Sequence, residues 1–210
     1  MSKKNLSKKM LMAATIAGAF LLSANAGNAD PTNVSTWDEL KTGLTSGSNM
    51  NMTGNIEVPE VLSVSGKNNT IIMNGKTLSG QAETTTGLNF TGNSTLNLTG
   101  GGTISGFYRP DTNPTKVDGT EYGILDIRSN SNLTISGEND NWTFSENTSG
   151  VGSINALNSS ISANVNKIVF DGNVSNAQGA GLRHQISDNT YIDNSASIVA
   201  NEIIFNNNEI

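Results

Sequence analysis

The sequence of 210 residues contains no cysteine, a single histidine and only 5% aromatic residues. Without cysteine no disulfide bond can form, so the folded chain must be stabilised by burial and hydrogen bonding alone. The sequence also has no serine–histidine–aspartate order, no glycine-rich phosphate loop and no metal-ligand spacing, which argues against the chemistry that depends on them. We therefore predict no catalytic residues, no cofactor and no metal site.

Long apolar runs are lacking too, apart from one near the N-terminus. Four lysines within the first nine residues precede the apolar run Met10–Leu22, and two small-x-small sequences end at Ala26 and Ala29. The run is shorter than the roughly 20 apolar residues that span a bilayer, so a cleaved leader is favoured over a membrane anchor. We predict that residues 1–29 are a signal peptide, cut after Ala29 in preference to Ala26, and that the mature protein is exported.

Positive charge is scarce once this leader is removed. The mature chain would carry 8 Lys and Arg against 18 Asp and Glu, a formal charge of −10. An acidic surface repels phosphate backbones and anionic lipid headgroups, so nucleic acid and the membrane surface are not expected partners.

What the sequence has in abundance is asparagine and glycine, with 31 and 22 residues respectively. Both are poor helix formers and favour turns. Between the turns lie short clusters that alternate apolar and polar residues, which is typical of half-buried strands and not of a disordered chain. Examples of these clusters are Ile56–Val58, Leu62–Val64, Thr70–Met73, Leu96–Leu98, Leu133–Ile135, Trp142–Phe144, Ile168–Phe170 and Ile203–Phe205. Such strands fit a sandwich, a propeller or a solenoid.

A repeated tetrad, Phe-x-x-Asn, favours the solenoid. Its four copies are Phe90 to Asn93, Phe144 to Asn147, Phe170 to Asn173 and Phe205 to Asn208. The last three phenylalanines are 26 and 35 residues apart, a spacing too irregular for propeller blades but suited to coils with loops of variable length. We predict an all-β fold, a single-stranded parallel β-helix in which each Phe stacks in the core. Each Asn is expected at a turn with left-handed backbone, where it forms ladders with its counterparts.

The segment after the leader is expected to cap the solenoid. Thr36 and Glu39 form the pattern of a capping box, and Trp37, Leu40 and Leu44 fall on one face of a short helix. We assign residues 30–55 to this N-terminal cap, although an ordinary surface helix has the same pattern, and residues 56–210 to the repeats. No polar helix follows the last apolar strand, so we expect that further coils and a membrane barrel lie beyond Ile210.

Chemistry-bearing side chains are few, and each has a simpler explanation as a solvated turn residue. Asp118, Glu121 and Asp126 lie near Arg128 in the sequence, Glu138 and Asp140 are expected together in a loop, and Arg183 precedes the sole histidine, His184. Because neighbours on a strand point to opposite faces, Arg183 and His184 are not expected to share a site.

The stretch between Phe107 and Tyr122 interrupts the strand pattern and is the best candidate for a contact loop. Its candidate contact residues are Tyr108, Arg109, Asp111 and Lys116. A passive insertion accounts for the same stretch equally well, because solenoids accept loops readily.

The tetrads, with Gly179-Ala180-Gly181-Leu182 nearby, resemble the passenger repeats of the polymorphic outer-membrane protein family of autotransporters. The resemblance covers roughly Ile56 to Ile210, and it implies a right-handed β-helix at the cell surface, outer membrane or outside the cell. It also implies an adhesin associated with virulence, attached to the membrane only through a barrel that this chain does not contain. Its partners would be glycans or proteins of host or neighbouring cells. A carbohydrate-active β-helix enzyme (a polysaccharide lyase or hydrolase) and an inert spacer are the alternatives.

Overall fold

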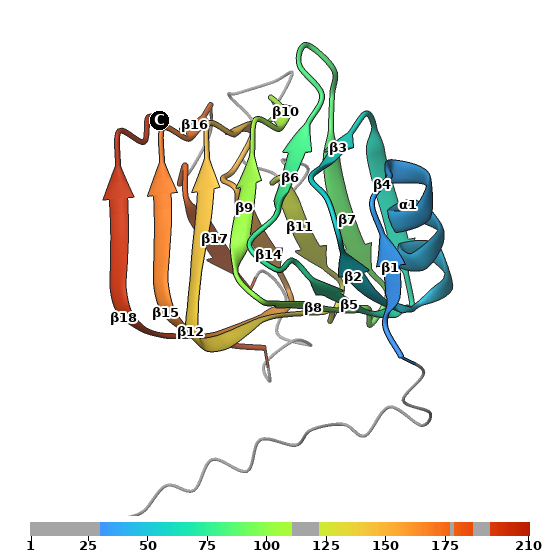
Figure 1. The fold of residues 1–210 in the computed structure, drawn as a ribbon. Coiled ribbons are helices and arrows are strands. Elements are labelled where there is room, and N and C mark those ends of the chain that lie inside the picture. The colour runs from blue at the N-terminus through green and yellow to red at the C-terminus, as the bar shows by residue number, and fades with distance from the viewer. Residues whose placement is uncertain (1–29, 111–121, 177–178, 187–193) are drawn as a thin grey trace, which may run out of the picture.

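The computed structural model describes residues 30–110, 122–176, 179–186 and 194–210, and within these the chain folds into one helix and eighteen strands (Figure 1). The predicted leader, with Ala26 and Ala29, lies outside the described residues. The helix is α1 (Trp37–Ser46). The strands are β1 (Thr32–Val34), β2 (Asn49–Met52), β3 (Ile56–Val58), β4 (Val61–Ser65), β5 (Asn68–Ile72), β6 (Thr77–Gly80), β7 (Gly87–Thr91), β8 (Thr95–Thr99), β9 (Gly102–Ser105), β10 (Tyr108–Arg109), β11 (Leu125–Arg128), β12 (Asn132–Ser145), β13 (Thr148–Ser149), β14 (Ile154–Leu157), β15 (Ser160–Asp171), β16 (Val174–Ser175), β17 (Leu182–Gln185) and β18 (Ala196–Asn206).

The strands form three sheets, and every pairing between named strands is parallel. The first and largest sheet contains β1, β2, β5, β8, β12, β9, β6 and β3 in this order, with β15 and β18 continuing it from β12. The second sheet runs β17-β14-β11-β7-β4, and the third runs β10-β13-β16. The predicted all-β class is therefore confirmed, with parallel pairing throughout the described strands.

Register aligns like residues across each sheet. In the second sheet Leu88 pairs with Leu62 on one side and with Leu125 on the other, and Leu125 pairs with Ile154. Because side chains alternate along a strand, such alignment places apolar side chains in rows on the inner face. The strands rise side by side in Figure 1, so these rows run along the length of the molecule.

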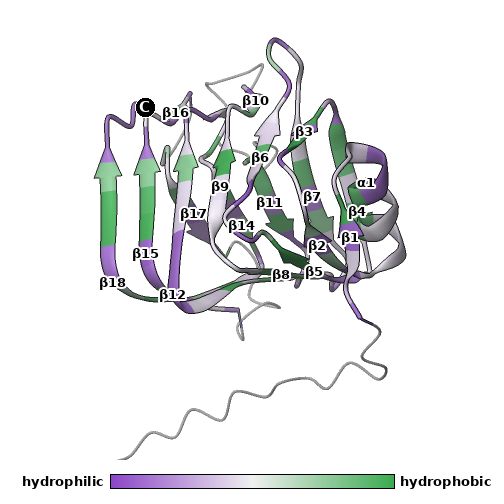
Figure 2. Ribbon diagram, viewed as in Figure 1, coloured by the Kyte–Doolittle hydropathy of each residue, from purple (hydrophilic) through white to green (hydrophobic). Residues whose placement is uncertain are grey.

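The apolar rows meet in one core enclosed by the sheets. In β8, for example, Leu96 and Leu98 are buried, while the three residues between and beside them face outward. The hydrophobic segments in Figure 2 follow the strands, and the polar residues gather at the turns. The largest buried side chains include Trp142, Phe90 and Phe107, and the helix α1 adds Leu40 and Leu44 to the core at one end.

Three strands, β12, β15 and β18, are longer than the sequence pattern indicated. The clusters Leu133–Ile135 and Trp142–Phe144 belong to one continuous strand, β12, which has an irregularity between Gly137 and Asn141. Glu138 and Asp140 lie within this strand, so their expected placement in a loop is wrong. Gly137 has a φ of 126°, a conformation open to glycine that allows the strand to turn a corner without ending.

The helix α1 has the predicted capping box. Thr36 accepts a hydrogen bond from the backbone N–H of Glu39, and the Glu39 carboxylate accepts one from the N–H of Thr36. Leu40 and Leu44 are fully buried where the helix packs against β1, β2, β3 and β4. The helix covers one end of the sheets (Figure 1), although β1 and β2 already pair in the first sheet, which thus begins before Ile56.

Glu60 ties this helix to the start of β4 and gives the cap a testable pH dependence. Its Oε1 atom accepts hydrogen bonds from Lys41 Nζ at 2.6 Å and from Trp37 Nε1 at 3.0 Å. These bonds, first that of Lys41 and then that of Trp37, lower the pKa of Glu60 below its ordinary value of 4.5. A lowered pKa means that the stabilisation is present above the ordinary value and is lost as the pH falls through the lowered one.

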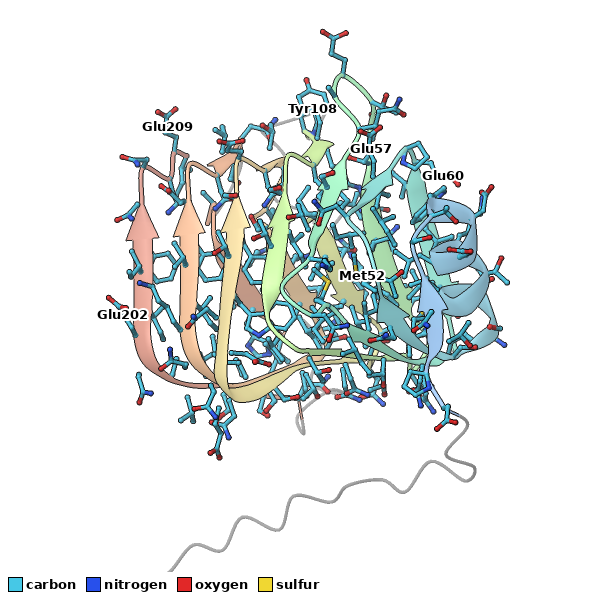
Figure 3. All side chains as sticks on the ribbon, viewed as in Figure 1. Met52, Glu57, Glu60, Tyr108, Glu202 and Glu209 are labelled. Carbon is cyan, nitrogen blue, oxygen red and sulfur yellow. The ribbon has the colours of Figure 1, made fainter. Side chains whose placement is uncertain are left out.

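We therefore expect Trp37 fluorescence to change in an acid titration with a midpoint below the ordinary pKa of a glutamate, since protonation of Glu60 weakens its bond to the indole. Glu60→Gln should abolish this transition. Glu57→Gln, on the same rim of the molecule (Figure 3), serves as the control and should leave it in place. A transition that persists unchanged in Glu60→Gln would contradict the assignment.

Candidate binding site on the outer face of the second sheet

A row of polar side chains crosses the outer face of the second sheet. It is formed by one residue from each strand, and in all strands but β17 this residue is flanked by core residues; Asp126, for example, lies between Leu125 and Ile127. We call these five residues, which pair in register from β4 to β17, the polar row. Its members are Ser63, Asn89, Asp126, Asn155 and Arg183.

Asp126 is the centre of the polar row. Although it faces away from the core, it is fully buried. Its Oδ2 atom accepts a hydrogen bond from Arg128 Nε at 2.5 Å, and its Oδ1 atom accepts bonds from Asn155 Nδ2 at 2.6 Å and from the Gly123 N–H at 3.2 Å. A buried carboxylate requires such partners, because an uncompensated charge away from water is costly. The bonds hold the strand residues and the preceding turn in one arrangement.

Arg109 reaches this row from β10. Its Nη1 atom donates to Asn89 Oδ1 at 2.5 Å and to the Gly123 carbonyl at 3.2 Å. Burial lowers the pKa of Arg109 from its ordinary value, an effect that the nearby Asp126 carboxylate opposes. The guanidinium also lies 4.1 Å from the ring centre of Tyr122, within the range of a cation–π contact.

The second guanidinium on this ring is that of Arg128, at 4.4 Å from the Tyr122 centre. Arg183 extends the polar row into β17, where it pairs with Asn155 and donates a hydrogen bond to Gln185 Oε1. These three are all the arginines that the sequence contains. A chain with an overall excess of acidic residues therefore concentrates its guanidinium groups on one face.

The rim of this face carries exposed aromatic side chains. Tyr108 is 44% exposed and Tyr122 is 41% exposed, whereas the other aromatic side chains within the described residues, apart from Phe205, are mostly buried. Tyr108 projects at the upper edge of the molecule in Figure 3. The exposed rings can stack on a flat ligand, while the buried guanidiniums of Arg109 and Arg183 and the largely buried one of Arg128 lie beneath this surface and hold its residues in place.

The structure brings together residues that the sequence placed in separate groups. Arg109, expected in a contact loop, and Asp126 with Arg128, considered as a chemical cluster, meet around Tyr122. Asp111, Lys116, Asp118 and Glu121 lie outside the described residues.

The expected separation of Arg183 from His184 is confirmed. Arg183 belongs to the outward polar row, whereas His184 pairs with the buried Ala156 and its Nε2 atom lies 3.0 Å from the carbonyl oxygen of Ser159.

Sequence reasoning missed Asn89 and Asn155. The signal that could have found them is a shared local pattern, a single polar residue between two apolar ones, which occurs as Leu-Asn-Phe in β7, Leu-Asp-Ile in β11 and Ile-Asn-Ala in β14. Once these strands are aligned, the polar residues of the three triplets fall in one row.

The phenylalanines of three tetrads stack as predicted. The rings of Phe144 and Phe170 are 5.2 Å apart between centres, and those of Phe170 and Phe205 are 5.1 Å apart. Phe90 is an exception, because it lies in the second sheet, in register with Val64 and Ile127. The expectation that all four rings stack in one column is wrong for Phe90. Its tetrad follows a strand of the second sheet, whereas the other three tetrads follow strands of the first sheet.

The asparagines of the same three tetrads form a ladder. Asn147 Nδ2 donates to Asn173 Oδ1 at 3.0 Å, and Asn173 Nδ2 donates to Asn208 Oδ1 at 2.9 Å. The amides also bind the backbone, since Asn173 Nδ2 donates to the carbonyl of Phe144 at 2.8 Å. Asn147 and Asn173 are fully buried, so the ladder satisfies polar groups inside the molecule.

The backbone at these turns differs from the prediction. Left-handed φ values belong to the residue before each ladder asparagine, namely Glu146, Gly172 and Asn207, and not to the asparagine itself. Only the separate tetrad follows the expectation, because Asn93 has a φ of 64°. In the ladder the turn residue points outward, and the next residue is thereby directed inward to its hydrogen bonds.

The segment Gly179–Leu182, which the resemblance to passenger repeats singled out, lies beside the stacked rings. A Cβ atom on Gly181 would be 2.9 Å from a ring atom of Phe205 and 3.0 Å from one of Phe170, so a side chain there would displace the rings. Ser153 precedes β14 as Gly181 precedes β17, and it donates from Oγ to Asn173 Oδ1 at 2.8 Å. The small residue at this place therefore contacts the ring stack in one segment and the asparagine ladder in the other.

No protein-family profile, no curated protein and no solved structure matches this chain. In the part of the chain that the structure describes, no helix is both long and apolar enough to cross a membrane. The same residues contain no cluster of three or more His, Asp or Glu side chains placed to hold a metal ion.

Proposed function

We propose that the chain is an exported surface protein whose sheets are the walls of a right-handed, single-stranded parallel β-helix, and that it acts as an adhesin or structural scaffold. The observation that carries the proposal is the parallel register of the strands, in which Phe, Asn and aliphatic residues lie beside their own kind from one strand to the next. Such stacking builds a rigid rod that holds an exposed face at a fixed place.

The resemblance to autotransporter passengers supports the same proposal. The ladder tetrads and the small residues beside them are in contact, which is a physical reason for a repeat that pairs the two. The basic and apolar leader supports export, and the absence of cysteine suits a chain that crosses membranes unfolded. The handedness of the coil and the location at the outer membrane rest on this resemblance.

The adhesive surface that we propose is the outer face of the second sheet, around Tyr108, Tyr122 and Arg109. Tyrosine and arginine are the side chains that contribute most to binding where they anchor an interface. The exposed tyrosine rings suit glycan or protein surfaces of other cells that present flat faces, and Arg109 supports the Tyr122 ring from below. The buried bonds of Asp126 and Asn89 hold these groups in place, so little ordering is needed on binding.

We expect Tyr122→Ala to reduce the attachment of cells that display the chain at least tenfold, because it removes the exposed ring that contacts both Arg109 and Arg128. Tyr108→Ala should reduce attachment less, because its ring does not lie over these two guanidiniums. Thr45→Ala on the exposed side of α1 is the matched control and should attach like the unchanged chain. Flow cytometry of the displayed protein would verify equal surface levels. Equal attachment by all variants would remove this face from the proposal and leave a scaffold without a ligand.

A further inference from the structure

A polar pocket of about 320 Å³ opens at three corners of the chain that belong to the first sheet. The corners are the turn at Gly75 between β5 and β6, the passage from β8 to β9 at residues 100–102, all of them glycine, and the irregularity of β12 at residues 139–141. Thr103 and Thr143 complete the lining. Among the described residues that line the pocket none is aromatic or has a large apolar side chain, so it offers a ligand hydrogen bonds in place of hydrophobic anchors.

The pocket stays open because the corners pack too closely for side chains. A Cβ atom on Gly101 would be 3.0 Å from the carbonyl oxygen of Asn141, and one on Gly102 would be 2.6 Å from that of Lys76. Gly101 also has a φ of 57°, a conformation that most residues with a side chain avoid. Backbone groups therefore form much of the wall, and a ligand can approach them closely.

Asp140 supplies the acceptor of this pocket. Its Oδ2 atom accepts a hydrogen bond from the Gly100 N–H at 2.9 Å. The carboxylate also packs against Gly137, where a Cβ atom would collide with it. Within the described residues Oδ1 has no donor, so a carboxylate held in one position has an oxygen to offer to a ligand hydroxyl.

Asn141 supplies the donor, because it is the last member of an asparagine ladder on the outside of the molecule. Asn201 Nδ2 donates to Asn166 Oδ1 at 3.0 Å, and Asn166 Nδ2 donates to Asn141 Oδ1 at 2.8 Å. On β9 the position beside Asn141 is Gly101, which has no side chain to continue the ladder. The ladder therefore fixes the amide of Asn141 and leaves its Nδ2 atom as a donor at the wall of the pocket.

Two rows of hydroxyl groups lead from the pocket across β6, β9 and β12, which lie side by side at the front of the molecule in Figure 1. Each strand has the sequence Thr-x-Ser, and the residue between the two faces the core. Neighbouring strands are about 4.8 Å apart, and every hydroxyl can both donate and accept. The rows consist of Thr77, Thr103 and Thr143, and of Ser79, Ser105 and Ser145.

We propose that the pocket binds one sugar ring of an uncharged polysaccharide, and that the neighbouring sugar units lie over the threonine and serine rows. The hydroxyl groups of a sugar can donate to Asp140 Oδ1 and accept from Asn141 Nδ2, and the rows continue the same exchange of hydrogen bonds along the polymer. The site lies on the first sheet and does not depend on the tyrosine surface of the second, so either can fail without the other.

The charges around the pocket favour an uncharged polymer. Glu57 pairs with Ser79, and Asp171 pairs with Ser145, so a carboxylate flanks the serine row at each end and repels anionic sugars. A metal ion fits less well, because Asp140 is the only carboxylate in the lining and Ca²⁺ takes roughly six to eight oxygen ligands.

Affinity electrophoresis of the full chain tests the site. In native gels that contain galactomannan, xyloglucan or dextran, all uncharged, at least one polymer should slow the chain, whereas the anionic polygalacturonate should not. Asp140→Asn keeps an oxygen for the Gly100 N–H but replaces the free acceptor by an amide donor, so it should raise the dissociation constant at least tenfold. Asp38→Asn on the exposed side of α1 makes the same change in net charge and should alter the constant less than twofold.

The threonine row has its own pair of variants. Thr103→Val removes a hydroxyl with little change of shape and should raise the dissociation constant at least threefold. Thr134→Val, which faces outward in the other half of β12, is the matched control and should leave the constant unchanged. Unfolding in urea shows that each variant is folded, so a loss of binding is distinguishable from a loss of structure.

Unchanged mobility in all three uncharged polymers would overturn the proposal, as would equal retardation of Asp140→Asn and the unchanged chain. Retardation that requires added Ca²⁺ would show that Asp140 holds a metal ion, and would overturn it too. Tyr122→Ala should be slowed like the unchanged chain. If Tyr122→Ala loses the retardation while Asp140→Asn keeps it, the polymer binds to the second sheet, and this inference is wrong although the proposed function stands.

Discussion

Replacing Asn173 by alanine is expected to lower the free energy of unfolding by on the order of 3–5 kcal/mol, because it leaves several buried polar groups without partners. The Oδ1 atom of Asn173 accepts bonds from the side chain and backbone N–H of Asn147 and from Ser153 Oγ. Its Nδ2 atom donates to the carbonyl of Phe144 and to Asn208. Water does not replace these bonds, since Asn147 and Ser153 are themselves fully buried.

The matched control is Asn166→Ala, which interrupts a second asparagine ladder on the outside of the molecule. Asn166 Nδ2 donates to Asn141 Oδ1 at 2.8 Å, and its own Oδ1 accepts from Asn201 Nδ2 at 3.0 Å. Because these amides reach solvent, water satisfies them after the substitution, and the cost should stay within about 0.5 kcal/mol. Equilibrium unfolding in urea measures both variants.

Equal losses in the two variants would contradict the argument, because they would mean that the ladder stabilises the chain by its repetition and not by its burial. A third variant, Asn173→Asp, keeps the shape but removes the donors to Phe144 and Asn208. It should also be strongly destabilised near neutral pH, since a buried carboxylate would face a carbonyl oxygen.

The ladder and the ring stack were the parts of the fold best predicted from the sequence. A Phe and an Asn three residues apart, at the end of each apolar cluster, locate the strand end, the inward ring and the turn within one short segment. The stack of Phe144, Phe170 and Phe205 follows because their strands are in register. Local patterns predict what lies on one face of one strand, and three such strands in register extend that prediction to the core.

The pairing of strands depends on residues that are far apart in the sequence, and the predictions made from local patterns failed where they depended on this pairing. Phe90 has the same tetrad as the others, but its strand pairs with β4 and β11 in the second sheet. The left-handed residues Glu146 and Asn207 are not glycines, and their conformation follows from the need to direct the next residue inward. The polar row has the same origin, since Asn89, Asp126 and Asn155 are far apart in the chain and meet only through register.

The candidate site differs in its side chains from the other outward-facing positions of the strands. Most outward positions carry Thr, Ser or Asn and repeat with little change from strand to strand. In the second sheet Asp126 and the arginines replace these residues, and Tyr122 lies over two of the guanidiniums. Charges there are buried and paired, so the register of the parallel strands determines the geometry of the site as strictly as it determines the core.

The ring stack yields the second large effect, in Phe170→Ala. The ring of Phe170 lies between those of Phe144 and Phe205 with interplanar angles of 19° and 10°, is 1% exposed and packs against Gly181. Truncation opens a cavity in the middle of the stack, and the expected loss in the free energy of unfolding is about 3–5 kcal/mol. Phe170→Leu should recover more than half of this loss, because it refills most of the volume.

Phe205→Ala is the matched control, at the end of the same stack. With 62% of its surface exposed, Phe205 should cost under about 1 kcal/mol when its alanine variant is unfolded in urea, since little apolar area leaves water on folding. Equal losses in Phe170→Ala and Phe205→Ala would contradict the argument, because they would mean that the burial of a ring within the stack does not determine what its removal costs.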